Sequence, residues 1–358
     1  MKILKVYIGY TFFQGAFGGG NQFLKALKKN LKKMCNYEKN PKKADCILFN
    51  SHHNIDDILR LKLKNQDKIF VHRIDGPIHL IRGNNRKIDK IIYKLNKIIA
   101  DGTVFQSEWS RKENYKHGLK KNHFEIVIKN ACDNSIFHPN EKKIDDNPIK
   151  RVKLIATSWS NNLNKGFALY KYLDENLDFN RYSMTFIGNS PIKFKNINNI
   201  SPKESKDLAN LLQNSHIFIT GSKNDPCSNA LIEALSCCLP SVALNDGGHP
   251  ELIKKGGEVF NTFDECIKKV EFIRNNYELY RSNIQVQNIE QITRQYLSFF
   301  KKIETNYSNN KYEPKKLSIF DYYNLLIRYF FIKGISIKYF LVNEIKRIKS
   351  RLLEINIV

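Results

Sequence analysis

The sequence predicts an α/β protein built from two doubly wound parallel sheets that face each other across a cleft, followed by a C-terminal helical extension. Short apolar runs alternate with stretches whose apolar residues recur every three or four positions, a pattern typical of strands alternating with helices. The strand candidates are nearly all apolar, so helices should cover both faces of each sheet. The length of 358 residues suits two domains of ordinary size.

The individual elements follow from this alternation in chain order. In the first half we expect helices at residues 21–34 and 85–99 and strands at 3–8, 46–49, 69–72, 103–106 and 124–128. The stretch HPNEKKIDDNPIKR (138–151) is charged, contains two prolines and lacks periodicity, so we interpret it as a linker. In the second half we expect a helix at 204–215 and strands at 152–156, 184–187, 216–220 and 241–244. The predicted domains are therefore 1–148 and 149–305, followed by a basic amphipathic tail at 306–358.

The composition limits the partners and the compartment. A formal net charge of +24 favours phosphorylated small molecules, anionic lipid or nucleic acid, although abundant Lys, Asn and Ile along the chain would also give a solvated basic coat. Basic motifs interleaved with aromatic residues do not occur, so nucleic acid is not expected. The seven cysteines form no C-x-x-C pair, and the start MKILKVYIGY resembles a strand more than a signal peptide. No apolar run approaches about 18 residues, so no membrane span is expected. Because an odd number of cysteines argues for free thiols in a reducing compartment, we expect a cytoplasmic protein.

The loops that follow the strands carry the candidate residues, because open parallel sheets bind ligands beyond the carboxyl ends of their strands. Gly18, Gly19 and Gly20 precede a helix and would let backbone amides approach an anion; a flexible turn is the alternative. Arg73 and Asp75 follow the third strand. They form either a structural ion pair that closes the turn or a pair that positions and stabilises a substrate.

The second half contains three charged candidates. Lys165 stands at the start of a helix, where its charge opposes the helix dipole unless an anion binds; an ordinary surface lysine is the alternative. Asp225 precedes a proline and could simply be the N-cap of the next helix. Glu233 lies two turns further along that apolar helix, where a carboxylate commonly binds a ribose diol, although a helical wheel would also accept it as a solvated residue. Gly247 and Gly248 then open another helix with free amides.

Together these motifs resemble the nucleotide-sugar domain of family 4 glycosyltransferases, which have the GT-B fold and retain anomeric configuration. That family carries Glu-x7-Glu, an alanine-rich helix, a Gly-x-Pro strand start and Gly-Gly-x-Pro-Glu. The corresponding features here are Asp225-x7-Glu233, EALSCCLPSVALN and GGHPEL. KNACDNSIFHP (129–139) is similar to the segment leading to the family's linker, and FIGN (186–189) to its mid-domain strand. The resemblance spans about residues 3–305.

The resemblance implies roles for individual residues. Lys165 would hold the donor's pyrophosphate, Asp225 the hydroxyls of the transferred sugar, and Glu233 the ribose hydroxyls. The catalytic residues would be Lys165, Asp225, Arg73 and Asp75. The implied donor-binding set is Gly19, Gly20, Ser158, Lys165, Asp225, Cys227, Ser228, Asn229 and Glu233.

The chain departs from the family pattern at three places. The Arg that usually precedes the Lys is replaced near Ser158, and Pro226-Cys227-Ser228 stands where the family usually has Gly-Phe-Gly. The acceptor-side catalytic histidine of the family has no clear match, which leaves His72, Arg73 and Asp75 as candidates.

The resemblance implies transfer of a sugar from a UDP- or GDP-linked donor to a glycan or lipid-linked acceptor, in the assembly of cell-surface polysaccharide or lipopolysaccharide. We expect no cofactor and no metal. The sequence has no Asp-x-Asp pair, so lysine and helix N-termini would stabilise the leaving diphosphate. The alternatives are a nucleotide-sugar 2-epimerase on the same fold, a basic nucleic-acid-binding protein, and a catalytically silent member of the fold.

The tail at 317–358 combines many aromatic and aliphatic residues with basic residues that interrupt every apolar run. Such a segment cannot span a bilayer, but it suits helices lying in the headgroup plane of an anionic membrane. The alternative is that it packs back on the first domain or forms a dimer contact. Membrane attachment would place the protein on the inner face of the cytoplasmic membrane.

Overall fold

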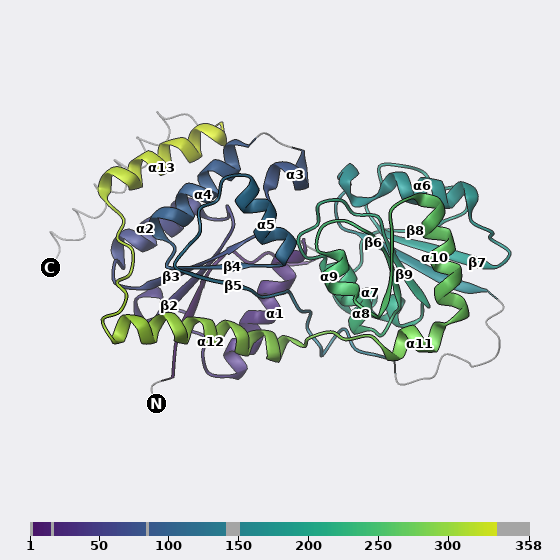
Figure 1. Cartoon of the computed structure of the whole chain (residues 1–358), viewed down its shortest axis with the longest axis horizontal. Helices are drawn as coiled ribbons and strands as arrows, with labels where there is room; N and C mark the ends of the chain where they lie inside the picture. The colour runs from purple at the N-terminus through teal and green to yellow at the C-terminus, as the bar shows by residue number, and fades with distance from the viewer. Residues whose placement is uncertain (1–2, 16–17, 84–85, 141–150, 335–358) are drawn as a thin grey trace.

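Each half of the chain forms a parallel sheet surrounded by helices, and the two sheets lie side by side (Figure 1). The computed structural model describes residues 3–15, 18–83, 86–140 and 151–334. Most of the predicted linker therefore lies outside the described residues. None of the helices in these ranges is long and apolar enough to cross a membrane.

The first sheet is doubly wound around its first strand. Its strand order is β1-β2-β3-β4-β5, with β1 (Val6–Gly9), β2 (Cys46–Asn50), β3 (Ile69–Ile74), β4 (Gly102–Phe105) and β5 (Phe124–Val127). Val6 pairs with Cys46 on one side and, through an isolated parallel bridge, with Tyr37 on the other. The chain thus runs first to one side of β1 and then to the other. The loops after β1 and β2 flank this switch point.

Helices consequently cover both faces of the first sheet. α1 (Gly19–Lys33) packs on one face, and α2 (Ile55–Lys64) and α4 (Lys87–Ile99) pack on the other. The short helices η1 (Pro41–Lys43) and α3 (Ile78–Arg82) and the helix α5 (Glu108–Lys116) complete the domain.

The second sheet reverses direction in the same way. Its order is β11-β10-β9-β6-β7-β8. The strands are β6 (Val152–Ser158), β7 (Tyr182–Gly188), β8 (Asn198–Ile200), β9 (Ile217–Thr220), β10 (Ser241–Leu244) and β11 (Gly257–Phe260). The helices are η2 (Leu163–Lys165), α6 (Phe167–Asn176), α7 (Ser205–Gln213), α8 (Asn229–Ser236), α9 (His249–Ile253), α10 (Phe263–Asn275) and α11 (Tyr277–Ser282). The switch point lies between β6 and β9.

The strand predictions hold for nine strands, with shifted ends, and two strands were missed. β8 has the sequence Asn-Asn-Ile and lies mostly exposed at one edge of the second sheet. β11 at the other edge begins with a glycine and contains a glutamate. Neither has the apolar run on which the predictions relied, because an edge strand is less buried than a central one.

The last two helices return to the first domain, as Figure 1 shows. α12 (Ile289–Ser308) buries its apolar face in the core of the first sheet, so the predicted boundary at residue 305 is displaced: residues 289–305 belong to the first domain's core. α13 (Ile319–Ile332) packs on α2 and α4. The described part of the tail therefore follows the alternative interpretation, while residues 335–358 lie outside the described residues.

Candidate functional site

An ion pair occupies the switch point of the second sheet. Lys165 ends η2 in the loop after β6, and Asp225 lies in the loop after β9. The distance between Lys165 Nζ and Asp225 Oδ2 is 2.9 Å. Loops diverge at such a point and leave a crevice that commonly binds ligands. The fold thus joins two predicted site residues from different loops.

The surroundings of Asp225 keep it ionised. Burial alone would raise its pKa, but the positive charge of Lys165, the nearby His249 and a hydrogen bond from the Cys227 backbone N–H together hold the pKa below its ordinary value. Lys165 is the more accessible partner, with 32% of its side chain exposed against 11% for Asp225. An anion entering the cleft can therefore reach the lysine first, leaving Asp225 to accept hydrogen bonds from hydroxyl groups.

The glycine pair of GGHPEL holds the backbone of Asp225. Gly248 N donates to Asp225 O at 2.8 Å, so this amide, expected to be free for a ligand, is already used. Gly247 has a φ of 62°, and a Cβ there would lie 2.4 Å from the same oxygen. Asp246 Oδ2 also accepts from Asn224 N at 2.9 Å. The close approach of the two loops therefore requires glycine at 247.

Asp225 does not cap the helix that follows it. α8 begins at Asn229, and its N-cap is Ser228, whose Oγ accepts from Leu231 N at 3.4 Å. Cys227 and Ser228 are buried, as is Ser158, whose hydroxyl donates to the Ser160 carbonyl. These three members of the predicted donor set hold the loops together, and none of them lines the pocket beside Glu233.

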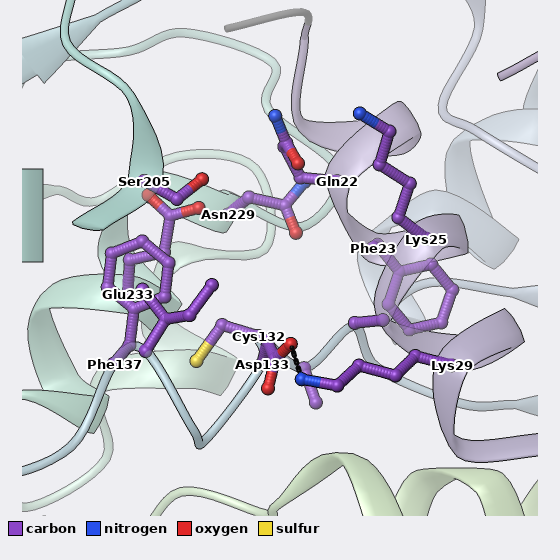
Figure 2. A pocket seen from close by; sticks show the side chains of 13 residues that line it. Gln22, Phe23, Lys25, Lys29, Cys132, Asp133, Phe137, Ser205, Asn229 and Glu233 are labelled. Atoms are coloured by element: carbon purple, nitrogen blue, oxygen red, sulfur yellow. Dashed lines mark hydrogen bonds and ion pairs between the residues drawn. The ribbon is translucent and has the colours of Figure 1, made fainter. Parts of the chain in front are cut away.

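Glu233 lines a pocket between the two domains (Figure 2). Glu233, Asn229 and Ser205 come from the second domain, and Gln22 and Lys25 face them from α1. The full lining is Gln22, Phe23, Lys25, Ala26, Lys29, Ala131, Cys132, Asp133, Ile136, Phe137, Ser205, Asn229 and Glu233. The sequence analysis predicted neither the α1 residues nor Ser205. Lys25 and Lys29 did not stand out because lysines are frequent throughout this chain.

The carboxylate of Glu233 has unused hydrogen-bonding capacity. Burial raises its pKa to about 8. Within the described ranges, no hydrogen bond or ion pair involves this side chain, whereas Lys29 across the pocket is paired with Asp133 at 2.7 Å. A buried carboxyl group without a protein partner keeps oxygen atoms that can accept hydrogen bonds from ligand hydroxyls.

The glycine loop brings α1 against α8 at this pocket. A Cβ on Gly19 would lie 2.1 Å from Asn229 Nδ2, whereas a Cβ on Gly20 would have no heavy atom within 4 Å. Gly19 therefore permits the close contact between domains, and Gly20 faces open space. The two predicted glycines have different roles in this structure.

Arg73 is bound to the protein itself. The side chain is fully buried. Its Nη1 donates to Asn50 Oδ1 at 2.5 Å and to Asp75 Oδ1 at 3.3 Å, and its Nη2 donates to Asn130 Oδ1 at 2.7 Å. The guanidinium also lies 4.8 Å from the ring centroid of Phe23. This arrangement matches the structural ion pair that the sequence left open, and it leaves Arg73 little access to a ligand.

His72 and Asp75 are also engaged. His72 is buried and stacks on Phe49 with 4.2 Å between ring centroids, while its Nε2 lies 2.9 Å from the Ser51 carbonyl. Burial lowers the pKa of His72 to about 4, so the ring is neutral at pH 7. Asp75 accepts a hydrogen bond from Gln106 but keeps 23% of its side chain exposed. Of these three candidates, Asp75 is the most accessible.

The sequence analysis missed a histidine pair at the switch point of the first sheet. His52 and His53 follow β2, with 4.6 Å between ring centroids, and the His53 ring lies 5.3 Å from that of Tyr10 in the loop after β1. Burial lowers the pKa of both histidines, that of His52 to about 3, although the charge of Asp75 acts in the opposite direction. Neutral imidazoles can accept a hydrogen bond or a proton. The signal was Ser-His-His-Asn directly after an apolar strand.

Direct hydrogen bonds join the domains around the cleft. The carboxylate of Glu251, the single acid of GGHPEL, accepts from Glu108 N at 3.0 Å and Trp109 N at 2.9 Å, at the N-terminus of α5. Asn164 and Asn224 of the second domain donate to the Leu80 carbonyl of α3 at 3.1 and 3.3 Å. The loops that carry Lys165 and Asp225 are thus fastened to the first domain.

Known proteins share part of this sequence. The family model described as Glycosyl transferases group 1 matches residues 194–285, which include Asp225, Glu233 and GGHPEL. A protein named "Probable sucrose-phosphate synthase" from Thermosipho melanesiensis is 26% identical over 235 residues, covering 57% of this chain and 55% of that protein. The chain therefore spans about half the length of the curated relative it matches.

Solved structures share the fold at low sequence identity. Anabaena Alr3699/HepE in complex with UDP-glucose has a TM-score of 0.60 and 13% identity, covering 86% of this chain and 100% of that one. The catalytic domain of starch synthase IV from Arabidopsis thaliana, bound to ADP and acarbose, has a TM-score of 0.63 and 10% identity, covering 85% and 100%. Identities at this level establish the fold alone. The predicted GT-B fold of two Rossmann-like domains is confirmed.

Proposed function

We propose that this protein is a glycosyltransferase that takes its sugar from a nucleotide-sugar donor. The observation that carries the proposal is the unpaired Glu233 carboxyl group in a pocket between the domains, within the segment that matches group 1 glycosyl transferases. The Lys165–Asp225 pair at the switch point of the same sheet supports it. A donor that spans pocket and switch point would meet an acceptor for ribose hydroxyls and a cation for phosphate.

Each residue has a role in the proposed reaction. Glu233 accepts hydrogen bonds from the ribose hydroxyls of the donor. Lys165 gives up its ion pair with Asp225 and binds the diphosphate oxygens. Asp225 then binds hydroxyls of the transferred sugar. As the sugar–phosphate bond breaks, negative charge accumulates on the diphosphate while the sugar becomes oxocarbenium-like, so a cation at the phosphate lowers the barrier. The acceptor hydroxyl oxygen then bonds to the anomeric carbon, and its proton passes to the leaving diphosphate. In the first domain, His52, His53 and Asp75 are the candidates for contacting the acceptor.

We also propose that the enzyme retains anomeric configuration and needs no metal. The support is the resemblance of Asp225-x7-Glu233 and GGHPEL to family 4 motifs, and the lack of an Asp-x-Asp pair in the sequence. NMR assignment of the product anomer tests retention. EDTA is expected to leave turnover unchanged; turnover abolished by EDTA and restored by Mn²⁺ would contradict this part of the proposal.

The donor is proposed to be UDP- or GDP-linked and the acceptor a glycan or a lipid-linked glycan in surface-polysaccharide assembly. The UDP-glucose complex of Anabaena Alr3699/HepE shows that a protein of this fold binds such a donor. The proposed location is the cytoplasm, with peripheral attachment to the inner face of the membrane.

A thermal-shift panel of nucleotide sugars and nucleoside diphosphates tests the donor class. Ligand at about a hundred times its Kd should stabilise the protein by about 2.7 kcal/mol. Glu233→Ala should lose most of this shift, whereas Lys171→Ala, at an exposed position on α6, should keep it. A wild-type protein unresponsive to every nucleotide, or a Glu233→Ala protein that responds fully, would defeat the proposal. Turnover of the donor without acceptor, to an epimerised sugar, would favour the 2-epimerase alternative.

A further inference from the structure

α13 has one buried and one exposed apolar face. The buried residues, which pack on α2 and α4, are Tyr322, Leu325, Leu326 and Tyr329. The exposed residues are Ile319 (67%), Phe320 (76%), Tyr323 (41%), Ile327 (41%) and Phe331 (69%). Four of these recur at intervals of four residues and so form one row along the helix. We call these five residues the apolar ridge.

A helix that served only to cover the first domain would carry polar residues on its outer face. Scattered exposed hydrophobic residues are ordinary, but a continuous row of large ones marks a surface that contacts a protein or a membrane. The apolar ridge is such a row, and two of its members are phenylalanines with most of their surface in solvent.

Basic side chains lie along the apolar ridge. Lys87 Nζ of α4 lies 5.9 Å from the ring centroid of Phe331, and Lys94 Nζ donates to Asn324 Oδ1 of α13 at 3.2 Å. The two lysines are therefore placed at successive points along the side of α13. On α13 itself, Arg328 is exposed. We call these residues, together with the exposed Lys333 at the end of α13, the basic flank.

The acidic residues of α13 and α2 each have a polar partner of their own. Asp321 is bound to the hydroxyl of Ser318 at 2.9 Å, at the N-terminus of α13. Asp56 and Asp57 of α2 lie 4.0 and 3.7 Å from Arg60. The surface thus combines exposed apolar residues with a positive edge.

We propose that the apolar ridge and the basic flank dock on an anionic lipid surface. The ridge side chains would enter the boundary between headgroups and acyl chains, and the flank would contact lipid phosphates. Charge argues against two other occupants. Residues 335–358 contain five Lys and Arg residues against two Glu, so they carry the same sign as the flank, and so does a second copy of the chain. An anionic surface offers the complementary charge.

This inference sharpens the proposed location, and its biological meaning rests on the proposed function, since it would bring the transferase to a lipid-linked acceptor. Lipid binding itself needs neither donor nor acceptor. Lys165→Ala should lower transfer about 10²–10³-fold yet sediment with vesicles like the wild type, so failure of one proposal is distinguishable from failure of the other.

Vesicle sedimentation of the full chain tests the proposal. Wild-type protein should pellet with vesicles of phosphatidylcholine and phosphatidylglycerol and much less with phosphatidylcholine alone. The double variant Phe320→Ser/Phe331→Ser should bind the anionic vesicles at least about tenfold more weakly. The matched control is Phe272→Ser/Leu279→Ser, which removes two residues that are 53% and 61% exposed in the second domain and should bind like the wild type.

A charge variant separates the two parts of the surface. Lys87→Glu/Lys333→Glu should weaken binding to anionic vesicles and reduce its dependence on salt. Melting temperatures of all variants should stay close to that of the wild type, because the substituted side chains are exposed.

Three results would overturn the proposal. The first is equal binding by the ridge variant and its control. The second is wild-type binding that ignores lipid charge. The third is a wild type that does not bind anionic vesicles. In that case, a dimer that light scattering detects in the wild type but not in the ridge variant would assign the ridge to a second copy. A lower melting temperature of the ridge variant would show instead that another segment of the same chain packs on the ridge, and the absence of both changes would leave the ridge without an occupant.

Discussion

The carboxyl-terminal edges of the two sheets differ in what their charged side chains bind. In the first domain, Arg73 is fully buried and is held by Asn50, Asn130 and Asp75. In the second domain, Lys165 is partly exposed and Glu233 lies unpaired in a pocket. Arg73 lies near the end of β3 and Lys165 in the loop after β6, so a charge at the carboxyl end of a sheet does not by itself define a site. The deciding property is hydrogen-bonding capacity that a ligand can reach.

Removing Arg73 should cause the largest loss of stability. Arg73→Ala removes one partner from a buried polar network and should lower the free energy of unfolding by about 3–5 kcal/mol. Denaturant unfolding measures this. The control Arg294→Ala removes an arginine that is 68% exposed and paired with Glu290, and it should change the midpoint little. Similar unfolding of the two variants would mean that Arg73 does not hold Asn50, Asp75 and Asn130 together.

Lys165→Ala should have the opposite profile, with activity lost and the fold kept. A missing cation at the leaving diphosphate should lower turnover about 10²–10³-fold. Its melting temperature should fall much less than that of Arg73→Ala, because Lys165 is partly solvated. The exposed Lys171 provides the control substitution, Lys171→Ala. A folded Lys165→Ala protein with wild-type kinetics would erase the difference between Arg73 and Lys165.

The contact between the domains can be tested with adjacent glycines. Gly19→Ala would force Asn229 to move, since the new Cβ would lie 2.1 Å from its Nδ2, and should cost about 1–3 kcal/mol or open the cleft. Gly20→Ala meets nothing within 4 Å and should leave stability unchanged or slightly raised. Unfolding and nucleotide binding of the two variants should therefore diverge. Identical behaviour would show that α1 does not approach α8 this closely.

Substitution of Glu233 should have a smaller effect on the free energy of unfolding, and this effect should depend on pH. Its folded-state pKa of about 8 exceeds the ordinary value of 4.5, so the folded protein binds more protons than the unfolded chain between these values. This contribution to stability therefore decreases as pH rises through that window. Glu233→Gln should be more stable than the wild type by about 1–2 kcal/mol near pH 8, given that solvent reaches the pocket, and the difference should vanish near pH 4. A pH-independent difference would mean that Glu233 is solvated.

Local patterns in the sequence predicted much of the architecture. Nearly apolar runs located nine of the strands, because a strand buried on both faces needs little polar sequence. The motifs around Asp225 and Glu233 also identified the loops of the second domain. Edge strands β8 and β11 escaped because their sequences are short and partly polar.

The sequence by itself determined the order of strands and helices, the two-sheet fold class and the charged residues available at the strand ends. Only the tertiary structure decided how those charges are used. Arg73 and Lys165 occupy similar places in the sequence pattern, yet one is enclosed by side chains from distant segments and the other reaches a cleft. The return of α12 and α13 to the first domain was decided in the same way. Burial and pairing depend on contacts between residues far apart in the chain, and local periodicity carries no information about those contacts.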